Sequence, residues 1–236
     1  MVLRMPAAVV CLPTYNELEN LEGMVRSLGD QGVRVLVIDD ASPDGTGRLA
    51  DELAAELPHV SVLHRERKEG LGPAYLAGFA RALAEGAELI LEMDCDFSHD
   101  PADVPRLIAA TEHADLALGS RYVEGGEIRN WGLVRRAISR GGSLYAQLLL
   151  GVGVRDLTGG FKCYRREVLE RIDLTAITSK GYAFQIETTY RALRAGFRVQ
   201  EVPITFVDRA EGGSKMSRRI VLEAIWKVPA LRVTRL

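Results

Sequence analysis

Acidic and hydroxyl side chains follow a buried segment near the middle of the chain. The mostly apolar run 89–93 has the composition of a strand, and Asp94 and Asp96 follow it directly. Ser98 continues the same alternate spacing, and Pro101 stands where a helix can begin. Oxygen ligands of this kind suit Mg²⁺ or Mn²⁺, and such ions commonly serve phosphate chemistry. The pattern therefore indicates a candidate metal site with Asp94 and Asp96 as ligands.

Two other interpretations of this segment compete with the metal site. The spacing of Asp94, Asp96, Ser98 and Asp100 resembles a calcium-binding loop. That loop needs a glycine where this chain has a histidine and a bidentate glutamate where it has a proline, so we exclude it. The second interpretation is an ordinary strand-to-helix turn capped by Ser98 or Asp100, and the segment alone does not separate it from a metal site. We interpret His99 as a support for this turn rather than as a base or ligand.

Polar side chains also follow the first two predicted strands. These residues are Pro13, Tyr15 and Glu17 after the first strand, and Asp39 and Asp40 after the second. Since the carboxyl ends of parallel strands meet at one edge of a sheet, these loops should converge with the metal loop on one crevice. Tyr15 can cover a nucleotide base, and Glu17 and Asp40 can accept hydrogen bonds from base and ribose. Asp39 is the expected structural partner of Asp40.

The periodicity of apolar residues predicts the elements that position these loops. Strands are expected at 7–12, 33–38, 60–63, 89–93 and 114–118, and helices from 17, at 46–57, at 73–85 and from 101. After Gly119 the alternation breaks, with a helix at 133–150, a strand at 161–164, a helix at 183–195 and a last strand at 199–207. This order predicts an α/β fold with a mostly parallel central sheet flanked by helices.

Composition limits the classes of function. The chain has 236 residues, a formal net charge of −2 and 47% hydrophobic residues, so nothing draws it as a whole to nucleic acid. Three cysteines in apolar contexts argue against a disulfide framework and for a reducing compartment. The longest uncharged stretch, between Arg140 and Arg155, is shorter than the roughly 20 apolar residues of a membrane helix. We therefore expect no nucleic-acid partner and no membrane-spanning segment.

These motifs, in this order, resemble the soluble catalytic part of the polyprenyl-phosphate (dolichol-phosphate) mannosyltransferases, inverting glycosyltransferases of family 2 with a GT-A fold. The resemblance extends over nearly the whole chain, through segments 12–17, 38–40, 42–46, 94–99, 119–122, 138–141, 156–161, 180–182, 202–209 and 214–215. It implies a single GT-A catalytic domain over 1–216, with a nucleotide-sugar-binding half at 1–119 and an acceptor-side half at 120–216. A basic amphipathic helix over 217–236 would follow.

The resemblance also implies roles for individual residues. The nucleotide-sugar positions are Pro13, Tyr15, Glu17, Ile38, Asp40, Asp94, Cys95, Asp96, Arg209 and Lys215. The acceptor-phosphate positions are Arg121, Arg135 and Ser139, the metal positions are Asp94, Asp96 and Ser98, and the catalytic positions are Asp96, Arg121, Arg209 and Lys215. Cys95 departs from the family, whose members often carry alanine there, and a small residue should be tolerated. We interpret Arg121 as lining a pocket, and leave Arg135 open between a pocket and a solvated basic face.

The implied reaction moves mannose from GDP-mannose to a polyprenyl monophosphate, with Mg²⁺ or Mn²⁺, and yields polyprenyl β-mannosyl phosphate and GDP. A metal ion and cations such as Arg209 and Lys215 would stabilise the departing diphosphate. A lipid phosphate is already ionised near neutral pH, so its attack needs no strong general base. Two alternatives stay open: another donor such as UDP-glucose, and a non-catalytic nucleotide-sugar-binding subunit.

The composition of the C-terminal segment indicates a membrane surface as a candidate partner. Residues 217–236 combine basic and apolar residues with Trp226, which suits the surface of an anionic membrane, or equally a helix that closes the core. Together with the apolar run 144–150, this helix could seat the lipid tail. We expect a cytoplasmic protein held peripherally on the cytoplasmic face of a membrane, with a separate membrane-anchoring subunit as a possible partner.

Overall fold

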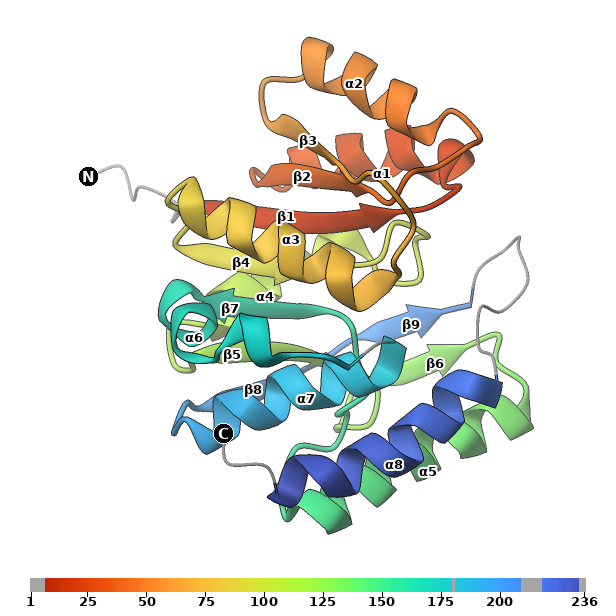
Figure 1. The fold of residues 1–236 in the computed structure, drawn as a ribbon, viewed down its shortest axis with the longest axis vertical. Helices are drawn as coiled ribbons and strands as arrows, with labels where there is room; N and C mark the ends of the chain where they lie inside the picture. Colours follow the sequence, from red (N-terminus) through yellow and green to blue (C-terminus); the bar gives the residue numbers. More distant parts are fainter. Residues whose placement is uncertain (1–6, 180, 209–217, 234–236) are drawn as a thin grey trace.

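A seven-stranded sheet forms the centre of the molecule (Figure 1). The computed structural model describes residues 7–179, 181–208 and 218–233, and the side chains of all of these except 218–225. The strand order is β3-β2-β1-β4-β7-β5-β8, and β7 is antiparallel to its neighbours β4 and β5 while the other pairs are parallel. The strands are β1 (Ala8–Thr14), β2 (Arg34–Asp39), β3 (Val60–His64), β4 (Leu89–Glu92), β5 (Leu116–Ser120), β7 (Lys162–Arg165) and β8 (Val199–Pro203). The predicted α/β fold with a mostly parallel sheet is confirmed.

Helices cover both faces of this sheet. The faces alternate along β1: Val10 and Leu12 pack with α1 (Leu18–Asp30), α2 (Thr46–Glu56) and α4 (Val104–Ala110). Val9 and Cys11 pack on the other face with α3 (Leu71–Ala84), α6 (Arg166–Arg171) and α7 (Gly181–Arg194), which lie in front of the sheet in Figure 1. Short 3₁₀ turns occur at Pro101–Asp103 and Leu174–Ala176.

The predicted single last strand, 199–207, was wrong. Pro203 ends β8 because it has no N–H for the ladder, and Ile204 instead donates its N–H to the carbonyl of Ser120 at 3.1 Å. The chain then forms β9 (Thr205–Val207), which pairs with β6 (Glu127–Arg129) in a separate two-stranded sheet. This small sheet lies beyond the carboxyl end of β8, so it extends the molecule beside the site edge.

Two helices pack together in the part of the molecule that was predicted to be the acceptor side. These are α5 (Leu133–Leu150) and α8 (Arg218–Val233), which lie side by side in Figure 1. Val228 and Leu231 of α8 are buried in a cluster shared with α5 and α7, while Trp226 is 77% exposed. The described part of α8 thus helps to close the core, one of the two roles expected for the C-terminal segment. Within the described ranges, no helix has the length and apolar character needed to cross a membrane.

Candidate active site

Backbone and hydroxyl groups join the loops that follow β1 and β2. The Asn16 N–H donates to Ser42 Oγ at 3.1 Å, and the Glu17 N–H donates to Thr46 Oγ1 at 3.0 Å. Asn16 and Ala41 both have left-handed backbones, with φ of 56° and 59°, which let each loop turn sharply after its strand. Tyr15 is half-buried and Glu17 is buried at this junction. The two loops therefore lie against each other at the carboxyl ends of β1 and β2, where they form one wall of the candidate site.

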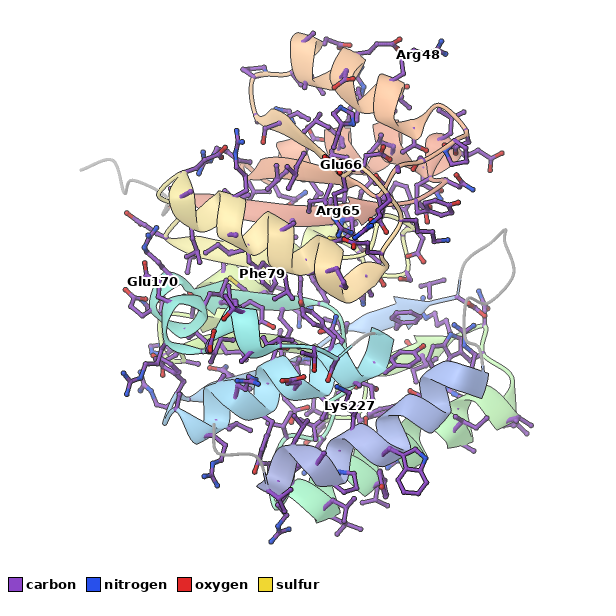
Figure 2. All side chains as sticks on the ribbon, in the orientation of Figure 1. Arg48, Arg65, Glu66, Phe79, Glu170 and Lys227 are labelled. Carbon is purple, nitrogen blue, oxygen red and sulfur yellow. The ribbon has the colours of Figure 1, made fainter. Side chains whose placement is uncertain are left out.

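Asp40 holds a third loop in place. Its carboxylate accepts hydrogen bonds from the backbone N–H of Glu69, at 3.2 Å, and of Gly70, at 2.9 Å, and it pairs with Arg65. Arg65 lies on the segment between β3 and α3, where Figure 2 labels it. Asp39 also has structural contacts, since Ser42 N–H lies 3.3 Å from its Oδ2. The contacts therefore do not divide the two acids into a structural and a binding residue, and nucleotide binding by Asp40 stays a prediction.

The same segment between β3 and α3 brings a cation to Tyr15. Lys68 Nζ lies 3.5 Å from the centre of the Tyr15 ring, within cation–π range. The sequence prediction missed both Lys68 and Arg65, although the charge run 64–69 was a signal. Ile38, in contrast, is fully buried and packs against the position of Gly78 on α3. Its proposed contact with the nucleotide is not supported by this burial, and its neighbour Pro13 is half-buried.

The loop after β4 carries the predicted metal ligands. Tyr75 donates its hydroxyl to Asp94 Oδ1 at 3.3 Å, and the Ser98 N–H donates to Asp96 Oδ1 at 3.1 Å. Cys95 between them is buried. Ser98 Oγ is buried and has no hydrogen-bond partner among the described residues, which is uncommon for a buried hydroxyl. Two carboxylates beside an unpartnered hydroxyl form a hard-oxygen donor set that fits Mg²⁺ or Mn²⁺.

On the acceptor side, Arg121 lies in a buried cluster rather than on the surface. Its Nε and Nη2 donate to the two carboxylate oxygens of Asp156, at 2.7 and 2.6 Å, and Nη2 also donates to Thr158 Oγ1 at 2.9 Å. Burial opposes the charge of Arg121, but the Asp156 carboxylate outweighs burial and holds the pKa of Arg121 above its ordinary value. A paired geometry of this kind fixes the guanidinium plane.

Arg135 and Ser139, both on α5, lie near this cluster. Arg135 Nη1 pairs with the Asp208 carboxylate at 2.7 Å, and its guanidinium carbon lies 4.2 Å from the centre of the Trp131 ring. Ser139 Oγ accepts the Tyr122 hydroxyl at 2.8 Å. Arg135 is therefore held by an aromatic ring and a carboxylate, and is not part of a freely solvated basic face. Arg209 and Lys215 lie outside the described residues.

His99 lies where the metal loop and the acceptor-side cluster meet. Its ring packs against Phe161 and Phe206, with ring centres 5.1 and 5.2 Å away. Burial lowers the pKa of His99 to about 4, while Asp96 acts to raise this pKa and Arg121 to lower it further. The Val207 N–H in β9 also donates to the Ser98 carbonyl at 3.1 Å. The two predicted halves of the site are thus neighbours, and His99 supports the junction.

A buried ion pair supports the strand that carries the metal loop. Lys162 Nζ on β7 lies 3.0 Å from Glu92 Oε1 on β4, and both side chains are fully buried. Lys162 also donates to the carbonyl and the side-chain oxygen of Gln185 on α7, at 3.0 and 2.6 Å. Burial raises the pKa of Glu92 and lowers that of Lys162, although each partner opposes the shift of the other. The pair ties β4 to β7 and α7 just before the chain reaches Asp94.

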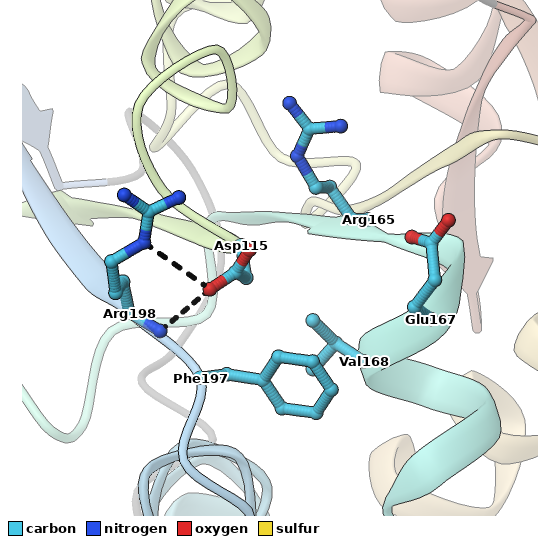
Figure 3. Close-up of a pocket in the computed structure, with 6 residues that line it drawn as sticks. All are labelled: Asp115, Arg165, Glu167, Val168, Phe197 and Arg198. Atoms are coloured by element: carbon cyan, nitrogen blue, oxygen red, sulfur yellow. Dashed lines mark hydrogen bonds and ion pairs between the residues drawn. The ribbon is translucent and has the colours of Figure 1, made fainter.

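A separate hollow of about 300 Å³ lies at the opposite edge of the sheet (Figure 3). Its lining residues are Asp115, Arg165, Glu167, Val168, Phe197 and Arg198. Several of its polar groups have protein partners: Asp115 pairs with the N–H and side chain of Arg198, and Arg165 donates to backbone carbonyls. Asp115 and Arg198 precede β5 and β8, so this hollow is at the amino ends of these strands, away from the candidate site.

Comparison with known proteins places the chain in a family. Residues 9–173 match the model of glycosyl transferase family 2. The chain belongs to this family. It is 54% identical over 225 residues to the polyprenol monophosphomannose synthase of Mycolicibacterium smegmatis, covering 93% of this chain and 84% of that protein. It is 52% identical over 219 residues to the undecaprenyl-phosphate mannosyltransferase of Micrococcus luteus, covering 92% and 90%. The chain is therefore a glycosyltransferase.

Solved structures of other transferases share its architecture. Glucosyl-3-phosphoglycerate synthase from Mycobacterium tuberculosis superposes with a TM-score of 0.69 at 20% identity, covering 94% of this chain and 80% of that one. The mannosyltransferase PcManGT from Pyrobaculum calidifontis gives a TM-score of 0.56 at 15% identity, covering 97% and 74%. These likenesses confirm the GT-A fold predicted for this glycosyltransferase.

Proposed function

We propose that this glycosyltransferase moves mannose from GDP-mannose to a polyprenyl monophosphate, releasing GDP and polyprenyl β-mannosyl phosphate. The observation that carries the proposal is the contact, through His99 and Val207, between an acidic loop and a segment with two paired arginines, the buried Arg121 and the half-buried Arg135. The acidic loop, with a bound divalent ion, suits a diphosphate donor. The arginines suit a phosphate acceptor. Two relatives at 54% and 52% identity are named for transfer of mannose to this class of lipid, which supports the choice of substrates.

The donor would bind along the loops after β1, β2 and β4. In this arrangement the Tyr15 ring covers the guanine base, and Glu17 and Asp40 stand near the nucleoside. Asp94, Asp96 and Ser98 would hold Mg²⁺ or Mn²⁺, which neutralises the diphosphate charge when bound. The family resemblance also assigns Arg209 and Lys215 to binding of the diphosphate.

The acceptor phosphate would bind beside Arg121, Arg135 and Ser139. Asp156 and Asp208 already pair with the two arginines, so these guanidiniums are fixed in orientation before any substrate arrives. The two carboxylates largely balance the charges of the arginines. The arginines would therefore act on the acceptor phosphate mainly as hydrogen-bond donors. The acceptor is an anion near neutral pH, so its oxygen can attack the sugar directly. Attack opposite the departing diphosphate inverts the anomeric configuration.

An exposed apolar face on α5 supports a peripheral position on the cytoplasmic face of a membrane. Large apolar side chains on this helix are exposed, namely Leu133, Val134, Ile138, Leu144 and Leu148. The helix also carries three arginines and no acidic residue, which suits anionic lipid headgroups. Flotation of the purified chain with anionic vesicles tests this position. Flotation that requires an added membrane protein would instead point to a separate anchoring subunit.

Transfer of labelled sugar to a short polyprenyl phosphate tests the proposed reaction. We expect transfer from GDP-mannose in Mg²⁺ or Mn²⁺, and little or none after chelation or from UDP-glucose or GDP-glucose. Preferred transfer from UDP-glucose would reassign the donor. Absence of transfer from every donor, with either metal, would overturn the proposal in favour of a nucleotide-sugar-binding role.

A further inference from the structure

Within the part of the chain that the structure describes, two buried N–H groups near the proposed acceptor site have no hydrogen-bond partner. They are the indole Nε1 of Trp131 and the guanidinium Nε of Arg135. Trp131 is only 8% exposed, and it lies in the segment between β6 and α5. A buried donor left without an acceptor destabilises a protein, so such groups are few in native proteins. Two of them on neighbouring residues indicate a ligand that accepts hydrogen bonds.

The surroundings of Trp131 favour an anion as that ligand. The Arg135 and Arg121 guanidiniums lie 4.2 and 5.6 Å from the centre of the indole ring. Phe206 packs edge-to-face against the same ring at 5.3 Å. These contacts hold the ring in one orientation and place two positive charges within 6 Å of it. A phosphate has several acceptor oxygens and a negative charge, and it matches both features.

The position of Trp131 favours the acceptor over the donor. Trp131 contacts Arg135, Arg121 and Phe206, which all lie in the acceptor-side half of the chain. Ring contacts connect Trp131 to the metal loop: Trp131 packs against Phe206, and the centre of the Phe206 ring lies 5.2 Å from that of His99. An anion held by Trp131 would therefore be near the metal loop without occupying it. This is the relation that an attacking phosphate has to a donor diphosphate.

We infer that the Trp131 indole N–H, beside Arg135 Nε, donates a hydrogen bond to a phosphate oxygen of the acceptor. The inference rests on the proposed function and adds a binding residue that the motifs did not indicate. The same chemistry would fit a lipid phosphate, free phosphate or the donor diphosphate. The experiment below uses each of these as a separate probe.

Trp131→Phe tests the hydrogen bond because it keeps an aromatic ring for Phe206 and Arg135 but removes the N–H. The matched control is Phe197→Leu, which changes an aromatic side chain in the hollow at the amino ends of β5 and β8, away from the candidate site. We expect Trp131→Phe to raise the KM for polyprenyl phosphate by about tenfold or more, the size of one hydrogen bond to a charged group. The KM for GDP-mannose should stay within about twofold, and the control should match wild type. An unchanged acceptor KM, or a rise in the donor KM instead, would overturn the inference.

Fluorescence gives a second measurement that does not need turnover. In Trp226→Phe the remaining tryptophan is Trp131, so its emission reports on this position alone. We expect a saturable change with a short prenyl phosphate, a weaker one with inorganic phosphate, and little change with GDP and Mg²⁺. No change with either phosphate, or a response to GDP only, would contradict the inference. If no donor supports transfer but prenyl phosphate still alters this emission, the proposed reaction fails while the phosphate site stands.

Discussion

The proposed donor side and the proposed acceptor side of the site are built in different ways. On the donor side, carboxylates at strand ends are held by backbone N–H groups, as Asp96 is by Ser98 and Asp40 by Gly70, although Asp40 also pairs with Arg65. On the acceptor side, guanidiniums are held by carboxylates from distant parts of the chain. The Arg121–Asp156 pair spans 35 residues, and the Arg135–Asp208 pair spans 73.

This difference means that the two sides would interact with phosphate groups in different ways. The donor side presents acidic oxygens, which a divalent ion can bridge to a diphosphate. The acceptor side contains the buried Arg121 and the half-buried Arg135, whose charges are already paired, so it offers oriented N–H donors more than net positive charge. A paired cation is stable when the site contains no substrate, because its charge is compensated in the buried cluster. Variants of Asp96 and Tyr15 test the donor side, variants of Arg121 test the acceptor side, and a variant of His99 tests the junction between them.

The largest effect is expected from Asp96→Asn on the donor side. Loss of one carboxylate from the metal loop should reduce kcat by about a hundredfold to a thousandfold, the range seen when one electrostatic group is removed from an active site. The unfolding midpoint should remain close to that of wild type, because the loop lies beyond the sheet. The matched control is Asp100→Asn, where the exposed carboxylate only caps a short turn. Transfer at wild-type rates with Asp96→Asn would remove the metal loop from the mechanism.

Arg121→Met should be the most destabilising change on the acceptor side. Removing one partner of a buried pair leaves Asp156 uncompensated, and we expect a loss of about 3–5 kcal/mol in the free energy of unfolding, measured with urea. The double variant Arg121→Met/Asp156→Leu should recover much of this loss. The control is Arg129→Met, whose pair with Glu127 is exposed and should contribute less than about 1 kcal/mol. A small effect of Arg121→Met would show that its pairing does not organise the acceptor side.

His99 should make the junction between the two sides sensitive to acid. Folding lowers its pKa from an ordinary value near 6.5 to about 4, because burial disfavours the charged ring. The stabilising contribution is therefore complete above about pH 6.5 and is lost as the pH falls toward 4, by about 3 kcal/mol in total. His99→Gln should flatten this part of the curve in urea unfolding between pH 4 and 7.5. The same slope in the variant would assign the acid sensitivity to other groups.

Tyr15→Ala should have the smallest effect of the four and should act on the donor side alone. Stacking of a base on an aromatic ring contributes about 1–3 kcal/mol, so the Kd for GDP measured by calorimetry should rise about tenfold. Tyr15→Phe keeps the ring and should bind GDP like wild type. Because Tyr15 lies on the donor wall, the KM for polyprenyl phosphate should change little. A selective rise in the acceptor KM would contradict the assignment of the donor wall.

The same contrast explains what the sequence could predict. Strand ends such as Asp94 and Asp96 are visible as local patterns, because a strand and its following loop are contiguous. The basic residues Arg121 and Arg135 were found by resemblance, and Asp156 and Asp208 lie in the resembling segments 156–161 and 202–209. Their pairing with the two arginines was not predicted, because no local pattern pairs residues so far apart. The turn at Pro203 that separates β8 from β9 was missed because the apolar run continues through it.

Lys68 and Trp131 were missed for a related reason. Lys68 belongs to a charged segment that resembles an ordinary solvated loop until the fold places it on the Tyr15 ring. Trp131 is a single aromatic residue in a loop, and its lack of a hydrogen-bond partner is a property of the packed structure. Both become visible only when residues from separate elements are seen together.

The anomeric configuration of the product tests the central claim most directly. Purified protein would be incubated with ¹³C-labelled GDP-mannose, Mg²⁺ and a polyprenyl phosphate, and the lipid product would be examined by NMR. Direct attack by the acceptor phosphate predicts β-linked mannosyl phosphate, formed in equal amount with GDP. An α-linked product, or consumption of GDP-mannose without labelled lipid, would contradict transfer by direct attack of a lipid phosphate held beside the metal loop.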